Sequence, residues 1–426
     1  MWQAAGGVEM LKGLLMSLEG IVRLILGIFC FYYFIISTFG WFKRSEIPCS
    51  DFPPANRFAI LIAAHDEEKV IGKAVHNLKS LDYPQNMFDV FVVADNCGDA
   101  TAKIARENGA RVYERFNAAK RGKGYSIDWM LKKLFDLDER YDAVCVFDAD
   151  NLASPNFLKE MNKRLMLGDK VIQGYLDSKN PEDTWISASY SISYWLSDRL
   201  FQLPRHYLGL SCTLGGTGFT VATGVLKELG WGTTSLTEDL EFSLKLVLRG
   251  MKVHWAHEAV VYDEKPLGLK QSCRQRKRWM QGHFDCAFRY MGRLLRRAFK
   301  ERDFVAADMA VYLLQPFILV INSVFALIDA ASAVLAVSAH GFKPSAFLAS
   351  FLLIAFISAL NIYIMLDEKK LTGKILAYFA VFTFYGLTWV PVIIQGFLDR
   401  NRKEWVHTPH TRAIDINDIR SFKQVG

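Results

Sequence analysis

Residues 143–154, AVCVFDADNLAS, are the stretch that decides the fold. An apolar run from Ala143 to Phe147 ends in two acids one residue apart, Asp148 and Asp150. Short apolar runs bounded by polar residues are typical of buried strands, and parallel α/β sheets bind ligands where their strands end. The stretch therefore predicts a buried strand carrying two carboxylates that could hold a divalent cation. Alone the signal is weak, because neighbouring acids in a loop are often just solvated.

The same pattern, a strand followed by polar groups, repeats upstream. Predicted strands and helices alternate in the order strand 58–64, helix 67–79, strand 90–94, helix 101–108, strand 111–113 and helix 123–135. Strands that alternate with helices predict a parallel sheet of the α/β class. We therefore expect a Rossmann-like domain whose ligand binds at the carboxyl ends of the strands.

Polar side chains stand where these predicted strands end. His65 and Glu67 follow the first strand and Asp95 follows the second. Lys123 lies in a basic loop, Lys120–Gly124, with glycines on both sides, which suits anion binding. Taken singly each has an ordinary explanation, since Asp favours turns and acids suit the start of a helix. Together they favour one shared site.

Two further motifs lie downstream. Thr237-Glu238-Asp239 offers a carboxylate that could act as a general base, although Thr237 could instead cap a helix whose first turn accommodates acids. Residues 275–279, QRKRW, place cations beside an indole. Such a group could bind a diphosphate and stack on a sugar ring, or it could form the basic face of a membrane-surface helix.

Apolar segments flank this domain. Four are long enough to cross a bilayer, which takes roughly 20 helical residues, and they lie at 21–41, 311–338, 345–366 and 375–398. The first is longer than the apolar core of a secretory signal, so we expect an uncleaved anchor. The second contains Pro316 and Asp329, so it could be kinked or broken into two pieces.

Two other segments are amphipathic. Ser187–Gln202 mixes aromatic side chains with charges, and Leu267–Phe299 is strongly basic with interleaved aromatics. Basic amphipathic helices lie along membrane surfaces, so we expect interfacial helices here. The alternative is that they are ordinary helices packed on the sheet.

Composition agrees with a mixed protein. Of 426 residues 51% are hydrophobic, and the net charge of +7 lies beside apolar spans, which favours membrane lipids or an anionic substrate over nucleic acid. The seven cysteines form no CxxC pair, so we expect reduced thiols rather than a zinc site. We divide the chain into an anchor (1–45), an α/β domain with interfacial helices (46–306), transmembrane helices (307–398) and a basic tail (399–426).

The ordered set of motifs resembles the processive family 2 glycosyltransferases, which include cellulose, hyaluronan and poly-N-acetylglucosamine synthases. The motifs that carry the resemblance are His65–Glu68, Asp95–Asn96, Gly122–Gly124, Asp148–Asp150, Gly216–Gly218, Thr237–Asp239 and Gln275–Trp279. The combination is far more specific than any one of them. It implies a GT-A (Rossmann-like) cytosolic domain inserted between transmembrane helices.

The resemblance also implies roles for individual residues. The nucleotide-sugar would be bound by His65, Glu67, Asp95, Lys123, Asp148 and Arg278. Asp150 would hold Mg²⁺ or Mn²⁺, Asp239 would be the catalytic base, and Glu238 and Trp279 would meet the acceptor. Ala63, Asp66 and Ala94 depart from the family pattern, which puts the details of uridine contact in doubt.

The function so implied is inverting, metal-dependent hexosyl transfer from a UDP-sugar to a growing β-linked polysaccharide, coupled to its translocation across the membrane. The alternative is a non-processive enzyme that glycosylates a membrane lipid. A third class, a transporter or sensor with an inactive domain, is disfavoured because Asp150 and Asp239 are intact. We expect an integral protein of the cell membrane with its catalytic domain in the cytosol.

The tail poses a topological problem. Residues 405–412, WVHTPHTR, are similar in composition to the gating loops of these synthases, although a solvated tail is an equal alternative. Three crossings after a cytosolic domain would place the tail outside the cell, yet its basic residues favour the cytosol. Dividing segment 311–338 near Asn322 would restore a cytosolic tail.

Overall fold

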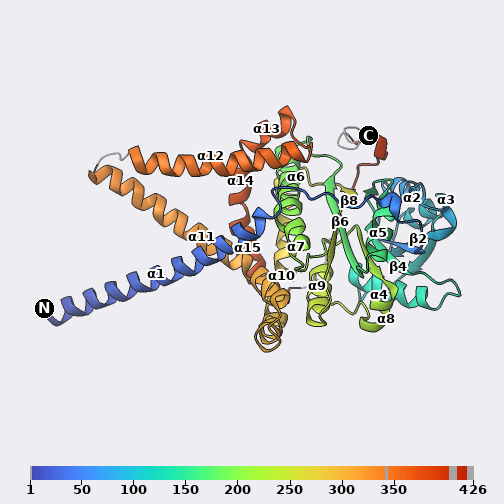
Figure 1. Cartoon of the computed structure of the whole chain (residues 1–426), viewed down its shortest axis with the longest axis horizontal. Helices are drawn as coiled ribbons and strands as arrows, with labels where there is room; N and C mark the ends of the chain where they lie inside the picture. The colour runs from blue at the N-terminus through green and yellow to red at the C-terminus, as the bar shows by residue number, and fades with distance from the viewer. Residues whose placement is uncertain (1, 341–343, 403–409, 420–426) are drawn as a thin grey trace.

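The computed structural model describes residues 2–340, 344–402 and 410–419. It contains an α/β domain, from one side of which long helices extend (Figure 1). The strands of its single described sheet are β1 (Phe58–Ala64), β2 (Phe88–Asp95), β3 (Arg111–Arg115), β4 (Ala143–Asp148), β5 (Leu152–Ala153), β6 (Val171–Ser178), β7 (Phe219–Ala222) and β8 (His254–Asp263).

The sheet has the order β3-β2-β1-β4-β7-β6-β8-β5. Strand β1 pairs in parallel with β2 and β4, and β2 pairs in parallel with β3. Strand β7 is antiparallel to both β4 and β6, so the second half of the sheet is mixed. The parallel sheet predicted for the first four strands is confirmed, and the carboxyl ends of β1, β2 and β4 meet at one edge.

Both faces of the sheet are covered at β1 and β4, which explains why these two strands are apolar along their length rather than alternating. On β1, Ala59 and Leu61 belong to one buried cluster, whereas Phe58, Ile60 and Ile62 belong to another on the opposite face. All five side chains are fully buried. The helices of the domain are α2 (Ile71–Lys79), α3 (Thr101–Glu107), α4 (Lys123–Phe135), α5 (Phe157–Met166), α6 (Trp185–Ser197), α7 (Leu203–Tyr207), α8 (Thr223–Leu229), α9 (Glu238–Leu248) and α10 (Leu269–Lys300).

Helix α4 has the bounds that the sequence predicts, but α2 begins four residues later than the predicted Glu67. Asp66 takes a positive φ of 53°, which ends the strand in a turn. The backbone N–H groups of Glu67 and Glu68 then donate to Thr101 and Asp99 in the loop after β2. These contacts keep residues 67–70 out of the helix. The acids at this point of the sequence, which are common near a helix start, did not indicate this.

Six helices flank the domain: α1 (Trp2–Thr38), α11 (Phe304–His340), α12 (Pro344–Asp367), α13 (Gly373–Phe379), α14 (Phe382–Leu387) and α15 (Trp389–Leu398). Residues 17–38 and 304–335 form helices long and apolar enough to cross a membrane. Helix α11 continues through Pro316 and Asn322, so of the alternatives considered for this segment the division into two pieces does not occur. A helix can pass a proline at the cost of one hydrogen bond.

The last apolar segment does not cross as a straight helix. Residues 373–379 and 382–398 are bent by 51°. Before the bend, Thr372 donates to Glu182 at 2.5 Å, and after α15 Asp399 pairs with Lys277 at 2.5 Å. Both ends of this segment contact the α/β domain. Such a bent pair is either a broken span or a re-entrant loop, so the separate crossing predicted for 375–398 stays a prediction.

The described part of the tail packs on the same domain. Lys73 pairs with Asp415 at 2.7 Å, and Ile419 is buried against Leu152 and Tyr262. Arg412 pairs with Asp183. The described part of the tail therefore packs on the α/β domain, which agrees with a tail on the same side of the membrane as that domain. Of the predicted gating segment, residues 405–409 lie outside the described residues.

The two predicted interfacial segments differ. Helix α6 is buried among the sheet and α12–α14, with Ile186, Tyr190 and Trp195 at most 2% exposed, so for α6 the alternative of a packed helix holds. A five-residue π-helix, η3 (Asp198–Gln202), continues it. The carboxyl half of α10 instead exposes Phe288 and Phe299 beside basic residues, as an interfacial helix would.

Candidate active site

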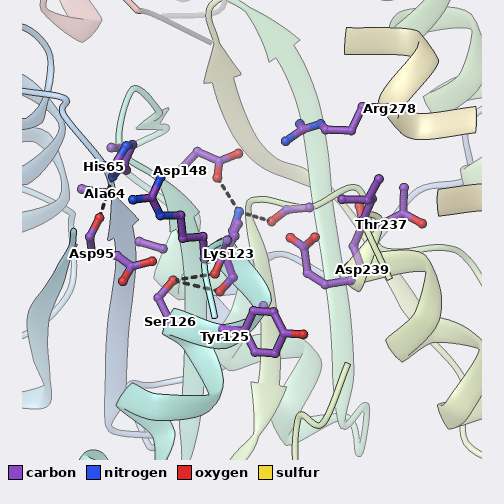
Figure 2. A pocket seen from close by; sticks show the side chains of 18 of the residues that line it. Ala64, His65, Asp95, Lys123, Tyr125, Ser126, Asp148, Thr237, Asp239 and Arg278 are labelled. Carbon is purple, nitrogen blue, oxygen red and sulfur yellow. Dashed lines mark hydrogen bonds and ion pairs between the residues drawn. The ribbon is translucent and has the colours of Figure 1, made fainter. Parts of the chain in front are cut away.

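A cavity of about 600 Å³ opens at the carboxyl ends of β1, β2 and β4, opposite the start of α9 and one face of α10. Figure 2 shows its walls, with Lys123 between Asp148 and Asp239. All ten site residues predicted from the sequence line this cavity: His65, Glu67, Asp95, Lys123, Asp148, Asp150, Glu238, Asp239, Arg278 and Trp279. The tertiary structure thus brings together groups separated by more than 200 positions.

Asp95 and His65 form the wall at the ends of β1 and β2. His65 Nδ1 lies 2.7 Å from the backbone oxygen of Asp95. The Asp95 carboxylate is buried and pairs with Arg115 at the end of β3. Burial raises the pKa of Asp95, and Arg115 opposes that effect. Arg115 therefore holds a carboxylate at the place where a base or ribose would be bound.

Lys123 is the central cation of the cavity. Its ammonium group pairs with Asp148 and donates to the backbone oxygen of Gly216 at 2.6 Å. Burial alone would lower the pKa of Lys123, but the carboxylates of Asp148 and Glu238 raise it. Lys123 is therefore charged at neutral pH and suited to a phosphate.

Three carboxyls gather beside it. Asp148 and Asp150 follow β4, and Asp263 ends β8 on the same wall. Burial, together with the charges of Asp150 and Asp148, raises the pKa of Asp263 to about 6. Concentrated negative charge on hard oxygen ligands fits Mg²⁺ or Mn²⁺. Asp150 is thus a suitable ligand for the predicted cation, with Asp148 and Asp263 beside it.

Asp150 already has polar partners. Its carboxylate accepts hydrogen bonds from Asn151 at 3.2 Å and from the Glu264 backbone N–H at 3.0 Å. His410, from the tail, contacts Glu67 at 2.9 Å and also lines the cavity. Burial by itself lowers the pKa of His410, but the carboxylates of Asp150 and Glu67 outweigh that effect and raise this pKa to about 10. An imidazolium therefore balances the carboxylates.

A second group of possible metal ligands, Asp66, Cys97 and Asp99, lies in the loops after β1 and β2. Its carboxylates accept hydrogen bonds from the loop itself: Asp66 from Gly98 at 2.7 Å, and Asp99 from Thr101 at 2.9 Å. These hydrogen bonds account for the two carboxylates as parts of the turns that follow β1 and β2. All seven cysteines of the chain are free.

Glu238 and Asp239 begin α9 on the opposite wall. Burial raises the pKa of both carboxyls, and the charge of Asp239 adds to the effect on Glu238. Gly216 has a φ of 84°, and a Cβ placed on it would stand 3.2 Å from an Asp239 carboxylate oxygen, so a side chain here would crowd that carboxylate. The Thr237 side chain makes no capping hydrogen bond to α9. The alternative that this motif is merely a cap therefore loses its main support.

Helix α10 presents alternate sides of the QRKRW motif to different partners. Gln275, Arg278 and Trp279 line the cavity. Arg278 extends from α10 over the cavity, above Lys123 and Asp239 (Figure 2). Arg276 points away from the cavity and is wholly buried against α14 and α15. Of the two arginines of the motif, only Arg278 is therefore placed to meet a diphosphate in the cavity, because residues two apart on a helix face different sides.

Sequence reasoning missed three cavity residues or their partners, namely Arg115, Asp263 and His410. For Asp263 a signal exists, since an acid follows the apolar run of β8 just as Asp148 follows β4. For Arg115 the signal is a cation at the end of a strand. His410 lies 343 positions from its partner Glu67, and no local pattern predicts that contact.

The family model described as "Glycosyltransferase like family 2" matches residues 53–282, more than half of the chain. The chain belongs to this family. The matched range contains the sheet, the cavity wall formed by α9, and most of the QRKRW-bearing half of α10. Membership of the family 2 glycosyltransferases confirms the resemblance based on motifs.

Curated relatives of this family 2 member make different products. A probable glycosyltransferase, YdaM, of Bacillus subtilis is 25% identical over 53% of the chain and 55% of its own length. A β-monoglucosyldiacylglycerol synthase of Trichormus variabilis is 27% identical, over 61% and 56%. A poly-β-1,6-N-acetyl-D-glucosamine synthase of Staphylococcus epidermidis is 23% identical, over 61% and 62%. The chain thus spans 55–62% of these relatives.

Among solved structures, the mannosyltransferase PcManGT of Pyrobaculum calidifontis, in complex with GDP-Man and Mn²⁺, resembles the fold of this family 2 chain with a TM-score of 0.57. The match covers 89% of the chain and 96% of the mannosyltransferase at 16% sequence identity. At that identity the likeness concerns the fold, and the predicted GT-A architecture is confirmed.

Proposed function

We propose that this chain transfers a sugar from a UDP-sugar, with inversion, to the growing end of a β-linked polysaccharide. The observation that carries the proposal is the arrangement of the cavity. Lys123 and Asp148 form one wall, Asp239 faces them, and Gln275, Arg278 and Trp279 close a third side. Donor-binding groups, a base and an aromatic acceptor platform are the parts that glycosyl transfer to a hydroxyl requires.

The reaction follows from these positions. A carboxylate oxygen of Asp239 takes the proton of the acceptor hydroxyl, whose oxygen attacks the anomeric carbon from the face opposite the departing diphosphate. The bond between that carbon and the diphosphate oxygen breaks, and UDP leaves with the electron pair. Lys123 and Arg278 supply positive charge for the leaving group. A divalent cation at Asp150 would add Lewis-acid stabilisation of the diphosphate.

A lipid acceptor is the second candidate, and the membrane helices favour it. Most apolar side chains described in α1, α11 and α12 are exposed, so these helices do not enclose a path for a polymer within one chain (Figure 1). Translocation of a product would then need several chains. Similarity to a β-monoglucosyldiacylglycerol synthase also supports this candidate.

We further propose that the protein is integral to the cell membrane, with catalytic domain and tail in the cytosol. Helices α1 and α11 have the required length, and both ends of the bent segment 373–398 contact the catalytic domain. Arg400 and Arg402 then follow the positive-inside rule. A cysteine introduced at Arg400 should react with an impermeant thiol reagent only in inverted vesicles.

Incubation of the purified full chain with individual UDP-sugars, with and without diacylglycerol vesicles, tests the proposal. A product of high molar mass supports the polysaccharide, and a single glycolipid supports the lipid acceptor. W279A should shorten the polymer while release of UDP continues, because the indole offers a platform to the acceptor and not to the donor. Unchanged polymer length and UDP release in W279A would remove Trp279 from the acceptor site.

A further inference from the structure

Arg276 is a buried cation without an acidic partner in the described part of the chain. Its guanidinium carbon lies 4.5 Å from the ring centre of Tyr385 and 4.8 Å from that of Trp389. Nη2 donates to the hydroxyl of Thr388 at 2.9 Å, between α14 and α15. Nη1 has no hydrogen-bond partner among the described residues. Burying a charge in this way is costly, and the two ring faces and the Thr388 hydroxyl are the contacts that offset this cost.

The rings that hold Arg276 continue to the cavity. The ring of Tyr385 lies 5.7 Å from that of Tyr190, and Tyr190 lies 6.0 Å from the indole of Trp279. The Tyr190 hydroxyl also donates to Gln275 at 3.0 Å. Two cavity residues of the QRKRW motif are thus positioned by a side chain that Arg276 supports through Tyr385.

Helix α15 packs too closely on α10 for the two to move independently. A Cβ on Gly396 would stand 2.5 Å from that of Met280 and 3.3 Å from the Lys277 carbonyl oxygen. Gln281 donates to the backbone oxygens of Asp399 at 2.9 Å and Arg402 at 3.1 Å. One side of α10 therefore faces the cavity, while the other side packs against α15, the last helix of the bent apolar segment.

We infer that Arg276 is a positioning residue that couples the α14–α15 junction to the acceptor side of the cavity. It sets the place of Trp279 and Gln275 through Tyr385 and Tyr190, and it does not contact the donor. The inference rests on the proposed role of Trp279 as the acceptor platform. The ligand bound by the residues that Arg276 positions is the sugar ring of the acceptor.

The test compares R276M with R274M, which removes an exposed charge from the same helix. R276M should lower kcat/KM for the acceptor by about 10- to 100-fold, the scale of a small misplacement of a reacting group. Its affinity for UDP should stay within about twofold of wild type, because only acceptor contacts move. R276K should not restore transfer, since an ammonium cannot stack between two rings and reach Thr388.

Thr388 gives an independent test that leaves the charge in place. T388V removes the hydroxyl that accepts from Arg276 and should impair the acceptor kcat/KM in the same direction, whereas T388S should restore it. Backbone amide hydrogen exchange in residues 382–389 should be faster in R276M and T388V than in wild type, and unchanged in R274M. This expectation does not depend on which sugar the enzyme uses. This readout needs no activity.

The outcomes separate the two hypotheses. If the wild-type chain transfers no sugar, the proposed function fails and the exchange data stand alone. If it transfers and R276M matches R274M in acceptor kinetics, the inference about Arg276 is overturned. An equal loss of UDP affinity and of transfer in R276M would assign Arg276 to the donor and also overturn it.

Discussion

Asp239 shows how a single side chain acquires a role from its surroundings. It starts a helix, where an acid is ordinary, but the Thr237 hydroxyl does not cap that helix and Gly216 admits the carboxylate to the cavity. D239N should lower sugar transfer by about 10²- to 10⁴-fold, the usual contribution of a general base. Binding of UDP, measured by calorimetry, should be nearly unchanged. Near-normal turnover per bound donor would place the base elsewhere.

The raised pKa of Asp239 predicts a pH dependence. A base must be ionised, and a raised pKa means that Asp239 becomes protonated at a higher pH than an ordinary aspartate. The rate should therefore fall on the acid side at a pH above the usual carboxyl range. Because Glu238 and Asp239 titrate as an interacting pair, E238Q should move this acid limb to lower pH. An acid limb at the same pH in E238Q would show that the two groups do not interact.

Asp150 combines burial with hard oxygen ligands beside Asp148 and Asp263. D150N should abolish activity that depends on a divalent cation, since a neutral amide is a poorer ligand for a hard cation. Activity would be titrated with Mg²⁺ and Mn²⁺ in wild type and variant, and binding of Mn²⁺ followed directly by paramagnetic resonance. Undiminished activity in a chelator would contradict the assignment.

At the scale of elements, the residue before α9 packs closely on α10 because Gly282 has no side chain. A Cβ on Gly282 would lie 2.4 Å from the Thr237 hydroxyl oxygen and 2.7 Å from the Thr237 backbone nitrogen. G282A should destabilise the protein by about 1–3 kcal/mol, as overpacking does, and shift Asp239 enough to lower activity. The readout is thermal unfolding together with the transfer rate.

Gly292 is the matched control, because nothing lies within 4 Å of a Cβ placed there on the same helix. G292A should stabilise the protein slightly, by about 0.5–1 kcal/mol, since alanine favours a helix over glycine. If G282A and G292A behaved alike, the close contact between α9 and α10 would be excluded.

At the scale of the whole molecule, Arg199 joins the membrane helices to the catalytic domain. It is fully buried in η3, donates to the backbone oxygens of Gly40 and Trp41 after α1, and pairs with Asp367 and Glu368 at the end of α12. R199M should destabilise the full chain by about 1–3 kcal/mol, because the buried Glu368 carboxylate loses its nearest cation and keeps, among the described residues, only Lys43 and His257.

The control for R199M is K103M. The Lys103–Glu107 pair is an exposed surface pair on α3 with a separation of 4.0 Å. Such pairs contribute only about 0–1 kcal/mol, so K103M should leave the thermal midpoint in detergent almost unchanged. Equal midpoints for R199M and K103M would mean that the joint between helices and domain does not limit stability.

The sequence by itself determined the parallel half of the sheet, β1 to β4, and one side of the cavity. Apolar runs such as 58–64 and 143–147 predict strands because both faces of a covered sheet must be apolar, and polar residues at their ends then meet at one edge. His65, Glu67, Asp95, Asp148 and Asp150 line the cavity for this reason. The motif at 237–239 and the cavity-facing members of QRKRW needed the family resemblance as well, since neither pattern is specific alone.

The tertiary structure decided the contacts between elements far apart in the chain, which local sequence periodicity does not encode. Hydropathy measures length and apolarity, so it could not show that segment 375–398 is bent by 51° or that Thr372 and Asp399 at its two ends contact the α/β domain. Composition could not show that His410 meets Glu67, or that Arg276 turns from the cavity toward Tyr385 and Trp389. Each depends on packing between elements far apart in the chain, where the burial of charge and the shape of both surfaces choose the contact.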